Sequence, residues 1–185
     1  MIEPGQTAQP LSGAEKVILS LRENSRPITL LPALYSAGYE QLAGSDPKYG
    51  SDSGAGAAKF GAAMLRSGST RVFDVGVFAA AFHQDPRYYR VGYGSIVDRG
   101  LHSAEQAVVR RGDNGSNQVN FSGIAGRAAA AVLTLAYYPP ASQTTKVVLS
   151  TFGTSIASDA GGNLVLEFLP DLARRFPILK KIQIE

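Results

Sequence analysis

The sequence predicts an all-α fold, in the form of a compact bundle of about five to seven helices rich in glycine and alanine. Three stretches carry this prediction, because Gly and Ala recur in them at helical spacing around a charged residue in the interior. Small residues at that spacing let helix backbones approach closely. Strand signals are weak, since long runs of alternating β-branched residues are missing. The three stretches are 72–82 with Asp74, 123–136 with Arg127 and 147–169 with Asp159.

The size of the chain, 185 residues, suits one hydrophobic core and is short for two domains. Residues 1–11 are polar and rich in Pro, Gly and Gln, which predicts a disordered leader. We expect residues 12–185 to form a single helical domain. Charged residues make up 18% of the chain, below the ~25% of an average globular protein. Low charge together with many small residues favours tightly packed helices or a lipid-facing surface.

Helix signals in the first half of the chain are separated by proline and glycine. Ser12 followed by Glu15 forms a capping box, which predicts a helix through about residue 23. Apolar residues at helical spacing predict a second helix over 33–43, after Pro32. The remaining expectations are a loop over 45–53, a helix over 54–65, a break or bend at 67–69, and a helix over 70–83 that stops before Asp85-Pro86.

The second half of the chain predicts fewer but longer helices. Residues 86–100 mix Tyr, Gly and Arg without clear periodicity and are expected to form a structured loop. A modest helix over 101–111 then leads into a turn over 111–118. Asn120 or Ser122 is expected to cap the next helix, which ends at the Tyr-Tyr-Pro-Pro sequence of 137–140. The last expectations are the longest helix, from 144 or 145 to 168, and an amphipathic tail over 171–176.

The charged residues inside the small-residue stretches predict an ion pair within the bundle. Arg127 is expected to pair with Asp74, with Asp159 or with both, and so to fix the register of the helices. Such a pair adds little net stability, but removing one partner leaves an uncompensated charge that costs about 3–5 kcal/mol.

Residues that could carry chemistry gather after the helix predicted over 70–83: His83, Asp85, Arg87 and Tyr88. His83 at a helix C-terminus fits a purely structural role, because a cationic side chain there complements the helix dipole. A functional interpretation would make His83 and Asp85 a general base or His83 an imidazole ligand. Since the sequence names no nucleophile to accompany them, we assign no catalytic residue.

Cofactors, metals and nucleic acids are not indicated by the sequence. The chain has no Cys, and its two His residues do not stand at metal-ligand spacing. The net charge of +3 is spread along the chain rather than gathered with stacking aromatic residues, as nucleic-acid binding would require.

The helices leave three interpretations open, and two of them involve a membrane. Residues 147–169 have the length of a membrane span, but the middle of this stretch is polar, and 123–136 is too short. The helices could therefore form the core of a soluble bundle, belong to a peripheral or embedded envelope protein, or form a multi-spanning membrane protein. Two small-residue faces are available for helix contacts, Gly153-Ala157-Gly161 and Gly126-Ala130.

Four short motifs resemble an uncharacterised family of envelope proteins from acidobacteria and other Gram-negative bacteria. They are His-Gln-Asp-Pro-Arg-Tyr-Tyr at 83–89, Asn-Phe-Ser at 120–122, Tyr-Tyr-Pro at 137–139 and Glu-Phe-Leu-Pro-Asp at 167–171. The chain departs from the family pattern at Gly123, Arg127 and Leu169, where Glu, Asn and Trp are common. The resemblance implies an exported protein, but it brings no activity and no role for any residue.

These observations together predict a non-enzymatic helical protein of the cell envelope, in the periplasm or outer membrane, whose sequence here lacks a signal peptide. We expect it to associate with a membrane or with other protein subunits, a homo-oligomer included, through small-residue helix faces. The alternatives are a small hydrolase or ligand-binding protein with its site around His83 and Asp85, and a cytoplasmic location.

Overall fold

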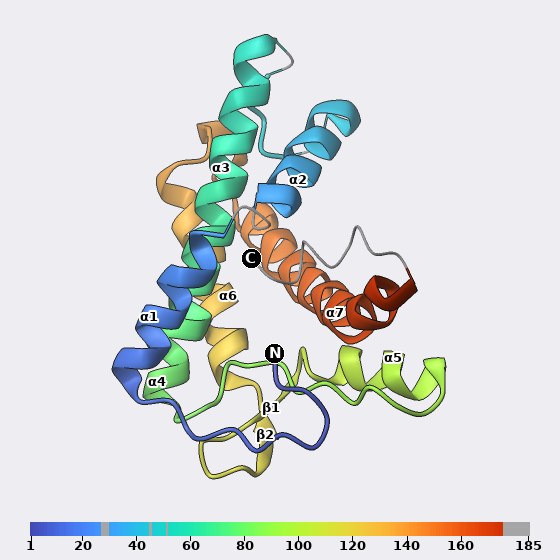
Figure 1. Ribbon diagram of the computed structural model, residues 1–185. Coiled ribbons are helices and arrows are strands. Elements are labelled where there is room, and N and C mark those ends of the chain that lie inside the picture. The colour runs from blue at the N-terminus through green and yellow to red at the C-terminus, as the bar shows by residue number, and fades with distance from the viewer. Residues whose placement is uncertain (27–29, 45, 51, 176–185) are drawn as a thin grey trace.

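The computed structural model describes residues 1–26, 30–44, 46–50 and 52–175, and it confirms the predicted all-α fold (Figure 1). A two-stranded hairpin accompanies the helices in this part of the chain. The main helices are α1 (Gly13–Asn24), α2 (Leu30–Ala43), α3 (Ser53–Arg71), α4 (Ala79–Ala81), α5 (Ile96–Glu105), α6 (Phe121–Leu133) and α7 (Thr145–Arg175). The shorter elements are the π-helix η2 (Val72–Phe78), the 3-10 turns η3 (Thr134–Ala136) and η4 (Pro140–Ser142), and the strands β1 (Val109–Arg111) and β2 (Asn117–Val119).

The centre of the fold is one long helix in which α3, η2 and α4 follow each other without a break (Figure 1). The break predicted at 67–69 is therefore wrong. Ser69 and Thr70 direct their hydroxyls back to the carbonyl of Arg66, at 3.1 and 2.8 Å, so their side chains bond within the helix that contains them. From α1, the Asn24 amide donates to the carbonyl of Gly68 at 3.1 Å and braces the same turn.

The other helices pack along this long helix or along one another. Helix α2 lies beside α3, both α1 and α6 lie against η2, and α7 packs across α6 with α5 beneath its C-terminal half (Figure 1). The closest approach is at Gly126 of α6, where a Cβ would lie only 2.5 Å from the backbone nitrogen of Asp74. The small-residue face that begins at Gly126 thus meets η2 directly. The predicted face at Gly153 and Gly161 instead has open space around both glycines.

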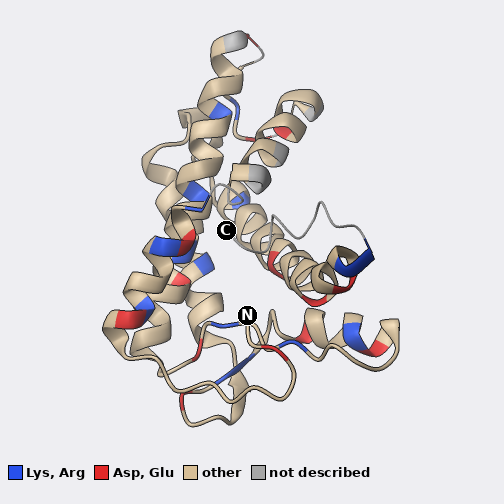
Figure 2. Ribbon diagram, viewed as in Figure 1, with Lys and Arg blue, Asp and Glu red and all other residues tan. Residues whose placement is uncertain are grey.

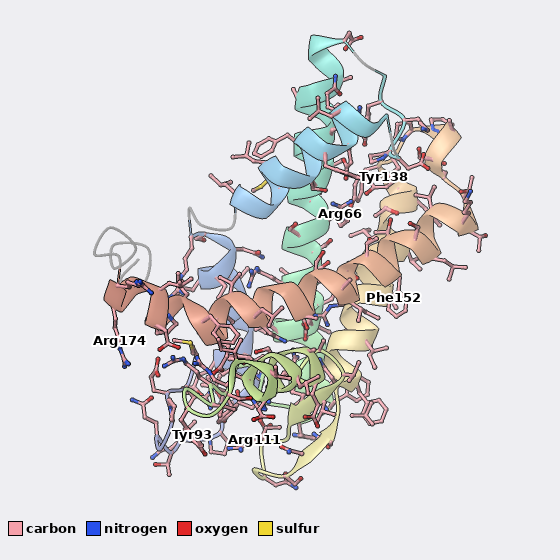
Figure 3. All side chains as sticks on the ribbon, turned by 90° about the vertical axis from the view of Figure 1, so that its right-hand side faces the viewer. Arg66, Tyr93, Arg111, Tyr138, Phe152 and Arg174 are labelled. Carbon is pink, nitrogen blue, oxygen red and sulfur yellow. The ribbon has the colours of Figure 1, made fainter. Side chains whose placement is uncertain are left out.

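A polar contact joins α2 and α3 to the chain that follows η3. Arg66 of α3 donates hydrogen bonds to the hydroxyl of Tyr138 at 2.9 Å and to Ser36 Oγ of α2 at 2.6 Å (Figure 3). Tyr138 is buried, and its ring meets those of Tyr49 and Tyr137 edge to face. This aromatic group and Arg66 thus link α2 and α3 to the chain that follows η3.

Several helix starts follow the signals in the sequence. Ser12 and Glu15 form the predicted capping box, and Asn120 caps α6 by accepting from the amide of Gly123 at 2.8 Å. Helix α2 starts at residue 30 rather than 33, which places Pro32 in the first turn, where its missing N–H has no helical partner to lose. Helix α7 continues through Pro170 to residue 175, so the separate tail predicted over 171–176 is absorbed into it, with residue 176 outside the described part.

The region between 86 and 119 differs most from the prediction. The helix expected over 101–111 is instead α5, which starts inside the predicted loop because Ser95 caps it, accepting from the amide of Asp98 at 3.1 Å. Residues 109–111 form strand β1, which pairs with β2 in an antiparallel hairpin. The predicted turn between them is present, and Asn114 holds it through a hydrogen bond from the amide of Ser116 at 3.0 Å.

Residues 1–11, which we expected to be disordered, lie in the structure against the segment that follows α4. Ile2 pairs with this segment in the manner of a short parallel strand: its amide donates to the carbonyl of Tyr88 at 2.8 Å and its carbonyl accepts from Arg90 at 3.0 Å. Glu3 adds an ion pair with Arg90 at 3.0 Å. These long-range contacts leave no local signal in the sequence of the leader.

The interior of the bundle is unusually polar. Its buried apolar residues are mainly Ala, and many buried side chains are charged or amide groups. Large apolar side chains are instead exposed on α1, α2, α3, η2, α5, α6 and α7. Figure 2 shows where the charged residues lie along the ribbon, with long uncharged stretches between them on the helices. The buried charged residues are Lys16, Glu40, Lys59, Asp74, Asp85, Arg90, Arg99, Arg127 and Glu167.

None of the helices in the described ranges combines the length and the apolar character needed to cross a bilayer.

Candidate functional site

The candidate residues His83, Asp85, Arg87 and Tyr88 lie in the extended segment between α4 and α5. The structure does not bring them together into one site, because consecutive side chains point to different partners. Asp85 and Arg87 face the leader and the hairpin, whereas Tyr88 faces α5 and α7.

His83 ends the long helix in a strained backbone conformation. Its φ of 53° lies in the left-handed region that usually favours glycine after a helix. The imidazole is exposed, while the backbone carbonyl accepts from the amide of Asp113 at 2.9 Å and so ties the helix end to the hairpin turn. His83 therefore contributes through its backbone, and the structure gives it no contact with Asp85.

Asp85 is buried and its carboxylate is occupied by neighbours on the same segment. Arg87 binds it through Nε at 2.9 Å and Nη2 at 2.6 Å, and the Tyr89 hydroxyl donates to it at 2.6 Å. Burial alone would raise the pKa of Asp85, but these hydrogen bonds outweigh burial and hold the pKa below its ordinary value. An ionised carboxylate saturated by an arginine is a poor general base, so the arrangement is structural.

Tyr88 connects the segment to a carboxylate that the sequence analysis did not single out as functional, Glu167 of α7. The Tyr88 hydroxyl donates to Glu167 at 2.9 Å and lies 3.1 Å from Ser103 Oγ of α5. Burial raises the pKa of Tyr88 to about 12, so its hydroxyl keeps the proton at neutral pH.

Glu167 is fully buried and binds four donors at once. Besides Tyr88, it accepts from the amides of Val91 at 3.1 Å and Gly92 at 2.8 Å and from Arg99 Nε at 2.8 Å. These donors outweigh the effect of burial and lower the pKa of Glu167. In the sequence, this site coincides with the Glu-Phe-Leu-Pro-Asp motif, but the residues that bind the Glu167 carboxylate lie more than sixty positions away from it.

Two arginines extend this contact around Glu167 into a clasp between the segment, α5 and α7. Arg90 and Arg99 both donate to the backbone carbonyl of Glu167 at 2.9 Å, and both bind Asp171, at 2.8 and 2.6 Å. Arg90 also binds Glu3 of the leader, as described above. The clasp therefore holds four separate parts of the chain together through buried or half-buried charges.

A second ionic cluster lies where η2, α6, α7 and β1 meet. It contains the three residues predicted to form an ion pair: Arg127 binds Asp159 at 2.6 Å and lies 3.4 Å from Asp74. Sequence reasoning missed the fourth member, Arg110 of β1, which binds Asp74 and donates to Ser122 Oγ at 2.8 Å. Arg110 was not predicted because it lies outside the three stretches of small residues in which a charge was expected to need a partner.

The pKa values of the two carboxylates in this cluster are shifted in opposite directions. Burial would raise the pKa of Asp74, but the two arginines outweigh it and lower the pKa. For Asp159, burial dominates over its pairing with Arg127, and the pKa is raised. One Nη of Arg127 is buried and has no hydrogen-bond acceptor among the residues that the structure describes. The cluster fixes how α6 and α7 sit on η2, and its charges balance.

A shallow cavity of about 180 Å³ lies between the leader and the hairpin turn. Asp85, Tyr89 and Asp113 line it together with leader residues, and His83 does not. One oxygen of Asp113 binds Lys16 at 2.6 Å, while the other is buried and has no hydrogen-bond partner in the described part of the chain. The lining thus combines the carboxyl-bearing Asp85 and Asp113 with the cationic Arg111.

Within the ranges that the structure describes, no group of three His, Asp or Glu side chains lies close enough together to hold a metal ion.

The chain matches no protein family model, no characterised protein and no solved structure. The resemblance of its four motifs to an envelope protein family thus stays a prediction. In the structure these motifs contain Tyr88, Glu167 and Asp171, which belong to the contacts around Glu167, and Asn120, the cap of α6.

Proposed function

We propose that this protein is a non-enzymatic helical component of the cell envelope that associates with a membrane through the apolar faces of its helices. The observation that carries the proposal is the inverted distribution of side chains. Charged groups are buried and paired in the interior, whereas large apolar side chains are exposed on each of the long helices.

The spread of the exposed apolar side chains favours lipid over a single protein partner. A protein partner covers one face and leaves one contiguous apolar patch. Ile18 of α1, Leu34 of α2, Val132 of α6 and Leu149 of α7 are all exposed, although these helices lie in different parts of the bundle (Figure 1). A lipid surface needs no matching shape, so one such face is enough for binding and the others can stay uncovered.

The buried charges support a structural rather than a catalytic role. The carboxylates of Asp74, Asp85 and Glu167 are each bound by arginine, and the pKa of each is lowered. Arginine pairs of this kind are costly to bury and expensive to break, so they specify one arrangement of the helices.

The experiment that tests the proposal is fractionation of the native protein from its host, with carbonate and then detergent washes. Release only by detergent supports membrane association. Recovery in the soluble fraction would overturn it and make the apolar faces a protein contact or a solvent-exposed surface. Separation of envelope from cytoplasm in the same preparation tests the location.

The cavity under the leader favours a second candidate function, the binding of a small ligand. Asp113 lines this cavity, and one of its oxygens has no hydrogen-bond partner among the described residues, so the ligand that we propose carries an amine donor. A thermal-shift series with small primary amines tests this function. A rise in Tm that the variant Asp113→Asn abolishes would support it, and no rise for any amine would contradict it.

A further inference from the structure

Helix α5 is amphipathic, but it turns its polar side inward. Arg99 and Ser103 are buried against α7, where Arg99 binds Glu167 and Asp171. The apolar side chains Ile96, Val97 and Leu101 are 65 to 77% exposed. A surface helix of a water-soluble protein normally shows the opposite arrangement, with its apolar stripe on the core.

The exposed apolar face of α5 is well defined on the helix. Ile96, Val97, Gly100, Leu101 and Ala104 recur at the i, i+1, i+4, i+5, i+8 spacing of one face. The exposed carboxylates Asp98 and Glu105 lie to one side of this face, so they would remain in water if the apolar face were covered. Such a division is typical of a helix that lies in the plane of a membrane interface.

The surroundings of α5 add an aromatic ring and two cations at one end. Tyr93, just before the helix, is 74% exposed. The ion pair of Arg99 with Asp171 brings the last turn of α7 against the start of α5, and Arg174 and Arg175 follow there, both exposed. In Figure 3, the labelled Tyr93 and Arg174 both lie to the left of α5. Tyrosine and arginine beside an apolar helix are the groups that favour an anionic lipid surface.

We infer that the apolar face of α5, with Tyr93, Arg174 and Arg175 at its edge, is the surface by which this protein docks on an anionic membrane. The inference rests on the proposed membrane association and adds to it the element that enters the interface. The apolar side chains enter the boundary between headgroups and acyl chains, and the arginines contact the lipid phosphates. The clasp around Glu167 holds α5 in this orientation.

Flotation with vesicles tests the inference on the purified full chain. The vesicles are phosphatidylcholine alone, or phosphatidylcholine with about 30 mol % phosphatidylglycerol to give a negative surface. The wild type is expected to float with the anionic vesicles. The double variant Val97→Ser/Leu101→Ser should bind roughly a hundredfold more weakly, because it loses most of the apolar area that enters the lipid. Its control, Val132→Ser/Leu149→Ser, changes the same residue types at comparable exposure on α6 and α7 and should float like the wild type.

The arginines and the depth of insertion have readouts of their own. Arg174→Ser/Arg175→Ser should lower binding to anionic vesicles by about tenfold and leave binding to neutral vesicles unchanged. The chain has no Trp, so the variants Leu101→Trp and Leu149→Trp each carry a single fluorophore. With anionic vesicles, the emission of the first should shift to the blue, and the emission of the second should not. This measurement also serves if the serine variants fail to fold, as circular dichroism would reveal.

Each remaining outcome decides against the inference. If the wild type and the α5 variant float equally, α5 is not the docking surface, while membrane association still stands. If the wild type does not float at all, the proposed function fails together with the inference. If it stays unbound but forms an oligomer that the α5 variant dissociates, the face is a protein contact and not a lipid contact.

Discussion

The contact between Gly126 and η2 makes a sharp prediction, because it is a contact between backbones. A Cβ built on Gly126 would lie 2.5 Å from the nitrogen, 2.6 Å from the Cα and 2.8 Å from the Cβ of Asp74. Ordinary contacts of a Cβ start at 3.4 Å. The variant Gly126→Ala must therefore push α6 away from η2 by roughly 1 Å, in the place where Arg127 and Asp74 are paired.

The expected change in the free energy of unfolding is the difference between two opposing effects. Overpacking of a buried contact costs about 1–3 kcal/mol, and more where the obstacle is backbone. Replacing a helical Gly by Ala returns about 1 kcal/mol of helix propensity. We expect Gly126→Ala to lower the free energy of unfolding by about 2 kcal/mol, which corresponds to a fall in Tm of about 4–8 °C for a chain of this length.

The matched control is Gly161→Ala on α7. This glycine is exposed and also helical, and its Cβ would meet nothing within 4 Å. The control should gain about 0.5–1 kcal/mol from propensity alone. Thermal and urea unfolding, followed by circular dichroism in the same buffer, measures both variants. A Gly126→Ala protein as stable as the wild type would refute the close packing of α6 on η2.

Three further predictions concern the buried polar groups. Arg127→Met should destabilise the fold by about 3–5 kcal/mol in urea unfolding, because it leaves the carboxylates of the ionic cluster with one cation fewer. Tyr88→Phe should cost about 1.5–3 kcal/mol, since it removes a donor to the buried carboxylate of Glu167, whereas Tyr93→Phe at the surface should cost nothing measurable. Asp85 has a lowered pKa in the folded state, so its contribution to stability is present above the unfolded value near pH 4 and is lost as the pH falls through the folded value. Urea midpoints measured between pH 7 and pH 3 should accordingly fall less steeply for Asp85→Asn than for the wild type.

Each of these has an outcome that would count against it. An Arg127→Met protein within 1 kcal/mol of the wild type would mean that the cluster is hydrated rather than buried. Equal stabilities for the two tyrosine variants would place the Tyr88 hydroxyl in water. Parallel pH profiles for Asp85→Asn and the wild type would show that this carboxylate has the same pKa in the folded and unfolded chain.

The fold class could be predicted because local signals for helices are strong in this chain. The capping box at Ser12 and the cap at Asn120 act within three residues, so they are visible in the sequence. The hairpin was missed because its strands are only three residues long and Val109 and Arg110 also fit a helical pattern. The break predicted at 67–69 is absent for a tertiary reason, because Asn24 of another helix donates a hydrogen bond to the carbonyl of Gly68.

At the candidate site, too, residues that a local rule selects could be predicted, whereas partners from distant parts of the chain could not. A charge inside an apolar helix needs a partner, and this rule was enough to select Arg127 and the two aspartates. The partners of Tyr88 could not be chosen in this way, because Ser103 and Glu167 come from separate helices. The motif that contains His83 drew attention to the imidazole, whereas the structure uses the backbone of that residue and the carboxylate of Asp85.

The π-helical turns of η2 have a consequence for the helix in which they lie. A π-turn closes its hydrogen bond over one residue more than an α-turn, so side chains advance around the axis by a smaller angle at each step. Seven such residues, 72–78, therefore change the phase between the faces of α3 and α4. This phase change sets the side on which α2 can dock above and the sides on which α1 and α6 can dock below. The number of residues in η2 is thus part of the architecture. Deleting one of them would rotate the helices packed on α3 relative to those packed on α4, even if the side chains outside η2 were unchanged.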